Sequence, residues 1–179
     1  MEITRQELDR LNFYAASELH GGLVLGRLAR GVRDASLLGE LLRHSAEEVE
    51  HARLWARTIA AVGGRIRPVR DTYQRHYARL LGPPGSVVQV LALTQVFERR
   101  VYRHFLHHAG MAGVHPRVRE TLLRMVEEEK HHLSWVKGWL DREDRRRDGE
   151  VSMLMRRFEA ADARIYGELC ERFGFRRAA

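Results

Sequence analysis

Two stretches of this sequence place a glutamate three residues before a histidine, within segments whose apolar residues repeat at helical spacing. Glu48 and His51 lie in AEEVEHARLW (46–55), and Glu128 and His131 lie in VEEEKHHLSW (126–135). Residues three apart share one face of a helix, and a carboxylate on an inward face is costly unless something compensates its charge. A bound metal ion would compensate it, but one such pair is weak evidence, so its context decides.

An internal repeat supplies that context. A shift of 80 residues aligns residues 11–55 with residues 91–135 without a gap. The polar matches include Glu18 with Glu98, Glu47 with Glu127, Glu48 with Glu128, and His51 with His131, and Glu40 also matches Glu120. Because a repeat of the fold alone would mainly preserve apolar character, these matches indicate that each half contributes ligands to one site.

The repeat predicts a site for two divalent metal ions. The predicted ligands are Glu18, Glu48, His51, Glu98, Glu128 and His131. In an antiparallel helical hairpin, a separation of thirty residues returns the chain to about the same height, so each single glutamate should come level with its Glu-x-x-His pair. Four carboxylates balance two divalent ions, Glu48 and Glu128 can each span both ions, and mixed oxygen and nitrogen donors favour iron or manganese. The assignment of the terminal ligands to one ion or the other stays open.

Residues beside the predicted ligands are interpreted mainly as packing residues. Tyr14, one turn from Glu18, is expected in the core, with a hydrogen bond to a bound oxygen species as the alternative. His44 is expected to be a core or rim histidine, with a proton relay as the alternative. Glu129 and His132, one step around the helix, are expected in a second row or at the surface.

The elements that must position these residues are helices. Periodicity and capping residues predict helical hairpins over about 4–62 and 86–145, a crossover over 63–85 with a short helix near 71–81, and a fifth helix over about 151–172. The expected fold is all-α: a single domain over 1–179 built as a ferritin-like four-helix bundle, with one long crossover between helices 2 and 3 and a short C-terminal helix.

Composition narrows the class of protein. With 44% hydrophobic and 31% charged residues, the chain has the composition of a globular protein. No segment is apolar enough for a membrane span or a leader, so a cytoplasmic protein with no membrane partner is expected. Cys170 is the only cysteine, which excludes an internal disulfide and a Cys-x-x-Cys appendage. The net charge of +7 permits a nucleic-acid partner without requiring one, and no specific motif supports it.

At the six predicted ligands the sequence resembles the ferritin-like carboxylate di-iron family, which includes ferritins, bacterioferritins, rubrerythrins and related hydroxylases. The resemblance covers about residues 4–145 and implies two iron ions, with manganese as the alternative in one or both positions. It also implies that Glu47 and Glu127 hydrogen-bond ligand histidines of the opposite pair. The implied function is a ferroxidase- or peroxidase-like oxidoreductase that activates dioxygen or peroxide and takes electrons from an unidentified donor.

Two alternatives stay open: a di-iron hydroxylase acting on an organic or tRNA substrate, and an iron-binding or storage protein. Rubrerythrins have a further glutamate one turn before the helix-3 ligand, where this chain has Gln95, and this departure argues against rubrerythrin-type peroxidase activity. Storage ferritins are usually acidic and this chain is basic, so a homo-oligomer such as a dimer is expected rather than a cage. A hydroxylase would need a pocket beside the metals, for which Gly21, Gly22 and Thr94 could leave room.

Overall fold

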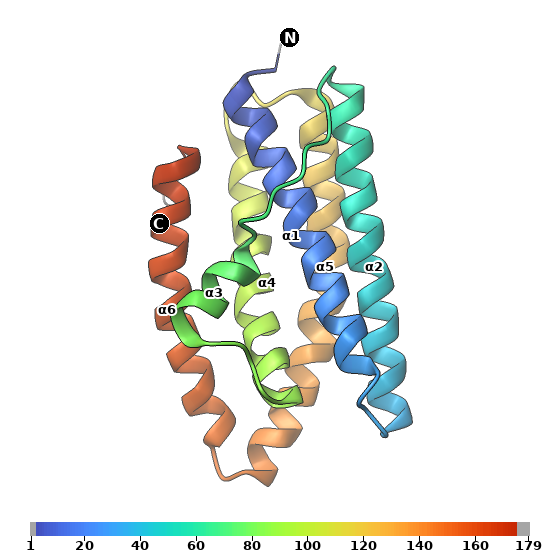
Figure 1. The fold of residues 1–179 in the computed structure, drawn as a ribbon, viewed down its shortest axis with the longest axis vertical. Helices are drawn as coiled ribbons and strands as arrows, with labels where there is room; N and C mark the ends of the chain where they lie inside the picture. Colours follow the sequence, from blue (N-terminus) through green and yellow to red (C-terminus); the bar gives the residue numbers. More distant parts are fainter. Residues whose placement is uncertain (1–2, 175–179) are drawn as a thin grey trace. The chain divides into compact units, whose positions relative to one another are not determined.

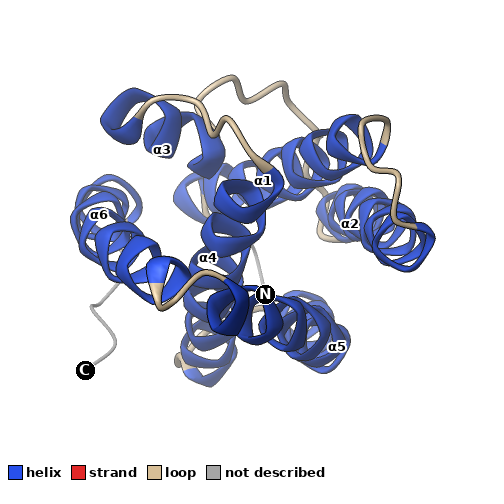
Figure 2. Ribbon diagram, turned by 90° about the horizontal axis from the view of Figure 1, so that it is seen from below, coloured by secondary structure: helices blue, strands red, loops and turns tan. Residues whose placement is uncertain are grey.

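The protein is all-α, as the sequence predicts, in a computed structural model that describes residues 3–174. Within that range there are six helices and no strand (Figures 1 and 2). The helices are α1 (Arg5–Ala29), α2 (Ala35–Ala61), α3 (Tyr73–Leu81), α4 (Val87–Gly110), α5 (Pro116–Arg146) and α6 (Glu150–Phe173). No helix in the described range combines the length and the apolar character needed to cross a membrane. The ferritin-like arrangement and the single domain stay predictions.

The helix starts follow from local capping chemistry. Thr4, Asp34 and Ser86 each accept a hydrogen bond from the backbone amide three residues on, at 3.1, 2.7 and 3.2 Å. These bonds satisfy amides that have no partner within the helix. Pro116 occupies the first position of α5, where its fixed backbone angle is favourable and its missing N–H costs nothing. The predicted helices are therefore found close to their expected bounds, and the hairpin predicted over 4–62 consists of α1 and α2.

The helices group into two compact units, and α3 and α5 each pass from one unit into the other. Among the described residues, unit 1 comprises 3–75 and 112–121, and unit 2 comprises 76–111 and 122–174.

In unit 1, α1 and α2 pack side by side (Figures 1 and 2). A Cβ added at Gly22 would lie 2.9 Å from the backbone oxygen of Ser45, so the close approach requires glycine here. The Ser45 hydroxyl donates a hydrogen bond to the Gly22 carbonyl at 2.7 Å. The connection after α2 follows α1, because the Asn12 side chain accepts a hydrogen bond from the Arg67 amide at 2.6 Å.

In unit 2, α4 packs along α6 (Figure 1). A buried polar network ties the two helices together and includes α3. Arg100 Nε and the Tyr77 hydroxyl each donate a hydrogen bond to the Asp162 carboxylate, both at 2.7 Å. The Tyr166 hydroxyl lies 3.0 Å from His104 Nδ1. The predicted C-terminal helix is therefore an integral part of this unit.

Candidate metal centre

Unit 1 contains a buried cluster of two carboxylates and one imidazole. Glu18 comes from α1, and Glu48 and His51 come from adjacent turns of α2; each residue is at most 3% exposed. Each residue offers one possible ligand atom, and these atoms lie within 4.8 Å of one another. The antiparallel packing of α1 and α2 thus brings together three residues that the sequence analysis singled out.

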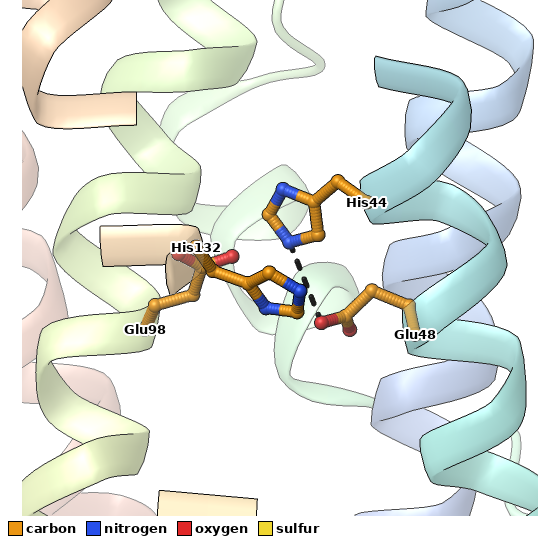
Figure 3. Close-up of side chains that lie close together, drawn as sticks. All are labelled: His44, Glu48, Glu98 and His132. Atoms are coloured by element: carbon orange, nitrogen blue, oxygen red, sulfur yellow. Dashed lines mark ion pairs between the residues drawn. The ribbon is translucent and has the colours of Figure 1, made fainter. Parts of the chain in front are cut away.

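A second histidine lies on the same face of α2. His44 is fully buried one turn before Glu48, and its Nε2 lies 3.5 Å from Glu48 Oε1 (Figure 3). His51 Nδ1 lies 3.8 Å from the same oxygen. The expectation that His44 is a core histidine is confirmed, and its position places Glu48 Oε1 close to two imidazoles.

The other carboxylate oxygen of Glu48 faces α1 at Gly21. A Cβ added at Gly21 would lie 2.9 Å from Glu48 Oε2 and 3.4 Å from Gln74 Nε2. Ordinary carbon–oxygen contacts are longer than the first of these distances, so a side chain at Gly21 would displace the carboxylate. Gly21 therefore leaves the space that the Glu48 carboxylate occupies. The substrate pocket expected beside Gly21 and Gly22 stays a prediction.

Unit 2 contains a second buried cluster with the same donor types. Glu98 on α4 and Glu129 and His132 on α5 are each at most 3% exposed. Glu129 Oε2 lies 3.2 Å from His132 Nδ1, and Glu98 and His132 offer ligand atoms within 4.8 Å of each other (Figure 3). Gln95, one turn before Glu98, is also buried, and its side-chain oxygen has no hydrogen-bond partner among the described residues.

The expectation that Glu128 and His131 face the core is wrong. The Glu128 side chain is 39% exposed and pairs with Arg124 at 2.8 Å, and His131 is exposed. The expectation that Glu129 and His132 lie in a second row or at the surface is also wrong, because these two residues form the buried pair of α5.

A difference of one residue between the two halves explains this correction. Buried positions of α1 and α4 match at a shift of 80, but those of α2 and α5 match at a shift of 81. The matches at 81 are Leu37 with Val118, Leu41 with Leu122, His44 with Met125, Glu48 with Glu129, His51 with His132, Trp55 with Val136, and Ile59 with Leu140. The run EEEKHH fits either shift. Identities outside this run, such as Trp55 with Trp135, favour the shift of 80, which places the wrong pair in the core.

The apolar spacing of α5 carried the signal for the correct pair. Met125 is fully buried. At about 100° per residue, His132 lies within about 20° of Met125 around the helix, whereas His131 lies about 120° away. A strict test of the helical face would therefore have selected His132 from the sequence.

The two glutamates expected to support ligand histidines lie nearer the surface. The Glu127 side chain is 68% exposed and pairs with Lys130 at 2.7 Å, so the prediction that it supports a buried histidine is wrong. Glu47 is about as exposed as Glu128 and accepts hydrogen bonds from Arg43 at 3.1 and 3.2 Å.

Tyr14 packs in the core of unit 1. Its ring lies against Trp55, with ring centroids 5.2 Å apart, and both side chains are buried. The packing role expected for Tyr14 is confirmed, and its hydrogen bond to a bound oxygen species stays a prediction.

A groove of about 750 Å³ lies on unit 1 between α1, α2 and the connection that follows α2. Four of its lining residues are large apolar side chains exposed to solvent: Leu19, Leu23, Val49 and Ile66. Its lining also includes four arginines: Arg53, Arg67, Arg70 and Arg75. His20, the neighbour of Gly21, also lines the groove, and burial, followed by the nearby Arg75 charge, lowers the pKa of His20 below its usual value.

The donor atoms of Glu18, Glu48 and His51 fit a metal ion. Metal–ligand bonds of about 2.0–2.2 Å place two ligand atoms of one ion at most about 4.4 Å apart, close to the spacing found here. The donors are carboxylates and imidazoles without a thiolate. No known family model, curated protein or solved structure matches this chain. The chemistry of the clusters therefore has to be inferred from their own residues.

Proposed function

We propose that this protein is a non-haem oxidoreductase that binds two iron ions, or iron with manganese, and uses them to activate dioxygen or peroxide. The observation that carries the proposal is the buried cluster of Glu18, Glu48 and His51, whose ligand atoms lie within 4.8 Å of one another. The resemblance to the ferritin-like di-iron family belongs to this proposal. It is supported by the all-α fold and by the order of the elements, in which the long helices α1 and α2 are separated from the long helices α4 and α5 by a connection that contains the short α3.

The proposed ligands follow the burial of the side chains. Unit 1 supplies Glu18, Glu48 and His51, and unit 2 supplies Glu98, Glu129 and His132. Glu129 and His132 replace Glu128 and His131 of the sequence analysis, because an exposed histidine cannot share in a buried site. The matching donor sets of the two halves support two ions rather than one.

Charge balance supports divalent ions. Four carboxylates buried to this degree are stable as anions only with strong compensation. Two divalent ions would supply four positive charges, and the imidazoles would bind them in the neutral form. Carboxylate and imidazole donors in this proportion suit iron and manganese.

Two bound irons would supply two electrons to one oxygen species. The protein's own residues shape the space around that chemistry. Trp55 and Tyr14 pack beside one another in the interior of unit 1 and limit the entry of water. Gly21 leaves the space that the Glu48 carboxylate occupies, because a Cβ there would lie 2.9 Å from Glu48 Oε2.

Anaerobic iron(II) titration tests the proposal. Wild-type protein is expected to bind two irons per chain, and exposure to oxygen should then produce the near-ultraviolet absorption of an oxo-bridged ferric pair. Glu129→Gln and His132→Ala should each lose at least one iron. Magnetic coupling between the two ferric ions would show that they are adjacent.

Adjacent residues offer matched controls. Glu128→Gln and His131→Ala change the same residue types at exposed positions and should retain two irons. If the Glu128 and His131 variants lose as much bound iron as the Glu129 and His132 variants, the revised ligand set is rejected. A folded wild-type protein that binds less than one iron per chain would reject the metal centre itself.

The groove on unit 1 favours a second function, oxidation of an organic substrate by a di-iron hydroxylase. Its exposed leucines, valine and isoleucine could hold an apolar body, and its arginines could hold an anionic group. A volume of about 750 Å³ lies within the range of small-molecule sites. This function predicts that oxygen consumption is slow with iron alone and that an amphipathic organic acid stimulates it, whereas a simple oxidase consumes oxygen without one.

A further inference from the structure

The two repeated halves differ at one buried position next to the proposed ligands. At the shift of 81 that aligns α2 with α5, His44 corresponds to Met125, and both side chains are fully buried. A methionine there only fills space, whereas the imidazole of His44 adds a donor nitrogen to unit 1. The interior of unit 1 therefore holds one more nitrogen donor than the repeat requires.

The geometry around Glu48 gives that nitrogen a role. Glu48 belongs to two groups of possible ligand atoms: one includes Glu18 and His51, and the other includes His44. His44 Nε2 lies 3.5 Å from Glu48 Oε1 (Figure 3). His51 Nδ1 lies 3.8 Å from the same oxygen. Because Glu48 belongs to both groups of possible ligand atoms, two metal positions can share its carboxylate, with a different histidine at each.

We infer that His44 is a further metal ligand, and that its Nε2 binds the second of two ions bridged by Glu48. This inference rests on the metal centre proposed above. The imidazole binds as a neutral donor, so it leaves the balance of four carboxylates and two divalent ions unchanged. It makes the two metal positions unequal, because one gains a nitrogen donor that the repeat does not provide.

Unequal positions have a measurable consequence. Nitrogen donors raise the affinity of a site for iron relative to manganese, in keeping with the general order of affinities for these ions. The two ions should therefore bind in two resolved steps, and removal of His44 should weaken one step while leaving the other intact.

The competing role for His44 is a hydrogen bond that orients Glu48. A nitrogen–oxygen distance of 3.5 Å is long for such a bond. The two roles differ in the number of imidazoles bound to metal: a ligand gives three for two ions, from His44, His51 and His132, and an orienting residue gives two.

X-ray absorption spectroscopy of wild-type protein loaded with two iron(II) ions counts these imidazoles directly. Three imidazoles for two ions is the expected result, and two would overturn the inference. Because the count needs no variant, it holds even if substitution of the buried His44 prevents folding.

Binding titrations of His44→Gln provide the second measurement, with His108→Gln as the control. His108 is equally buried and lies outside both clusters. His44→Gln should weaken one binding step at least tenfold and leave the other unchanged, and His108→Gln should change neither. If both binding steps are unchanged in His44→Gln, the role of His44 as a ligand is overturned and the metal centre stands. If wild-type protein binds no iron, both the role of His44 and the metal centre are overturned.

Discussion

Individual buried carboxylates in this protein are compensated in two different ways. Asp162 accepts hydrogen bonds from Arg100 and Tyr77, which is the arrangement expected of a structural ion pair. The groups that approach Glu48 at 3.5 and 3.8 Å are instead histidines, His44 and His51. Imidazoles are poor permanent counter-ions near neutral pH but good metal ligands, so this contrast supports a metal centre at Glu48.

Gly21 gives a prediction at the scale of one residue. Gly21→Ala would place a Cβ 2.9 Å from Glu48 Oε2 and displace the carboxylate, so metal affinity should fall at least tenfold while the protein stays folded. Metal titration with circular dichroism checks both points. Gly39→Ala is the control, because no atom lies within 4 Å of its added Cβ. It should keep full affinity and stabilise α2 by about 0.5–1 kcal/mol. Unchanged affinity in Gly21→Ala would contradict the tight fit at Glu48.

The attachment of α6 gives a prediction at the scale of an element. Asp162→Ala removes the carboxylate that holds Arg100 and Tyr77, so the free energy of unfolding should fall by about 3 kcal/mol. Glu159 lies on the same helix as Asp162 and forms an exposed ion pair with Arg99. Glu159→Ala should therefore lower the free energy of unfolding by less than about 1 kcal/mol. Urea denaturation of both variants checks the difference. Equal losses would mean that the buried network contributes no more than a surface pair.

The turn between α5 and α6 gives a pH-dependent prediction. Asp148 and Gly149 adopt positive φ angles of 55° and 85° there, and Asp144 accepts hydrogen bonds from the Ser152 hydroxyl and, at 2.9 Å, from the Ser152 amide. The hydroxyl, followed by the amide, holds the pKa of Asp144 below its usual value. A lowered pKa in the folded state contributes stability above the unfolded pKa of about 3.9, and this stability is lost as the pH falls through the folded pKa.

Ser152→Ala should therefore lower the melting temperature at pH 7, with a smaller difference from wild type at a pH well below 3.9. Melting curves at several pH values check this trend. Ser134→Ala, at an exposed position of α5, should match wild type throughout. A difference that stays constant with pH would show that the hydroxyl acts by packing rather than through the Asp144 charge.

At the scale of the whole molecule, each compact unit contains one buried cluster. Metal binding should therefore stabilise the folded chain as a whole. Free metal at one hundred times its dissociation constant contributes about 2.7 kcal/mol, so a chelator should lower the melting temperature clearly. Glu18→Gln in unit 1 and Glu98→Gln in unit 2 should each make the fall in melting temperature caused by the chelator smaller. Glu120→Gln, at an exposed position, should keep it. A chelator effect unchanged in all three variants would place the metal elsewhere.

Much of the secondary structure could be predicted from the sequence because its signals are local. Capping residues such as Thr4 and Ser86, and Pro116 at the start of α5, act on the nearest turn of backbone and need no distant partner. The short α3 and the C-terminal α6 lie close to the segments 71–81 and 151–172 that helical periodicity predicts. The contact of His44 with Glu48 could also be predicted from the sequence, because the two residues lie one turn apart on α2.

The helical character of the chain, and the recurrence of glutamates and histidines at metal-ligand spacing in both halves, follow from the sequence alone. The apolar spacing of α5 favours the pair Glu129 and His132, whereas the matches of the 80-residue repeat favour Glu128 and His131, and the packing of the folded chain settles which pair faces inward. Each residue turns the helix by about 100°, so a shift of one position moves a side chain from the core to the surface. Residue identity in EEEKHH fits either register. The packing of Leu122, Met125 and Val136 in the interior selects Glu129 and His132 and leaves Glu128 and His131 outside.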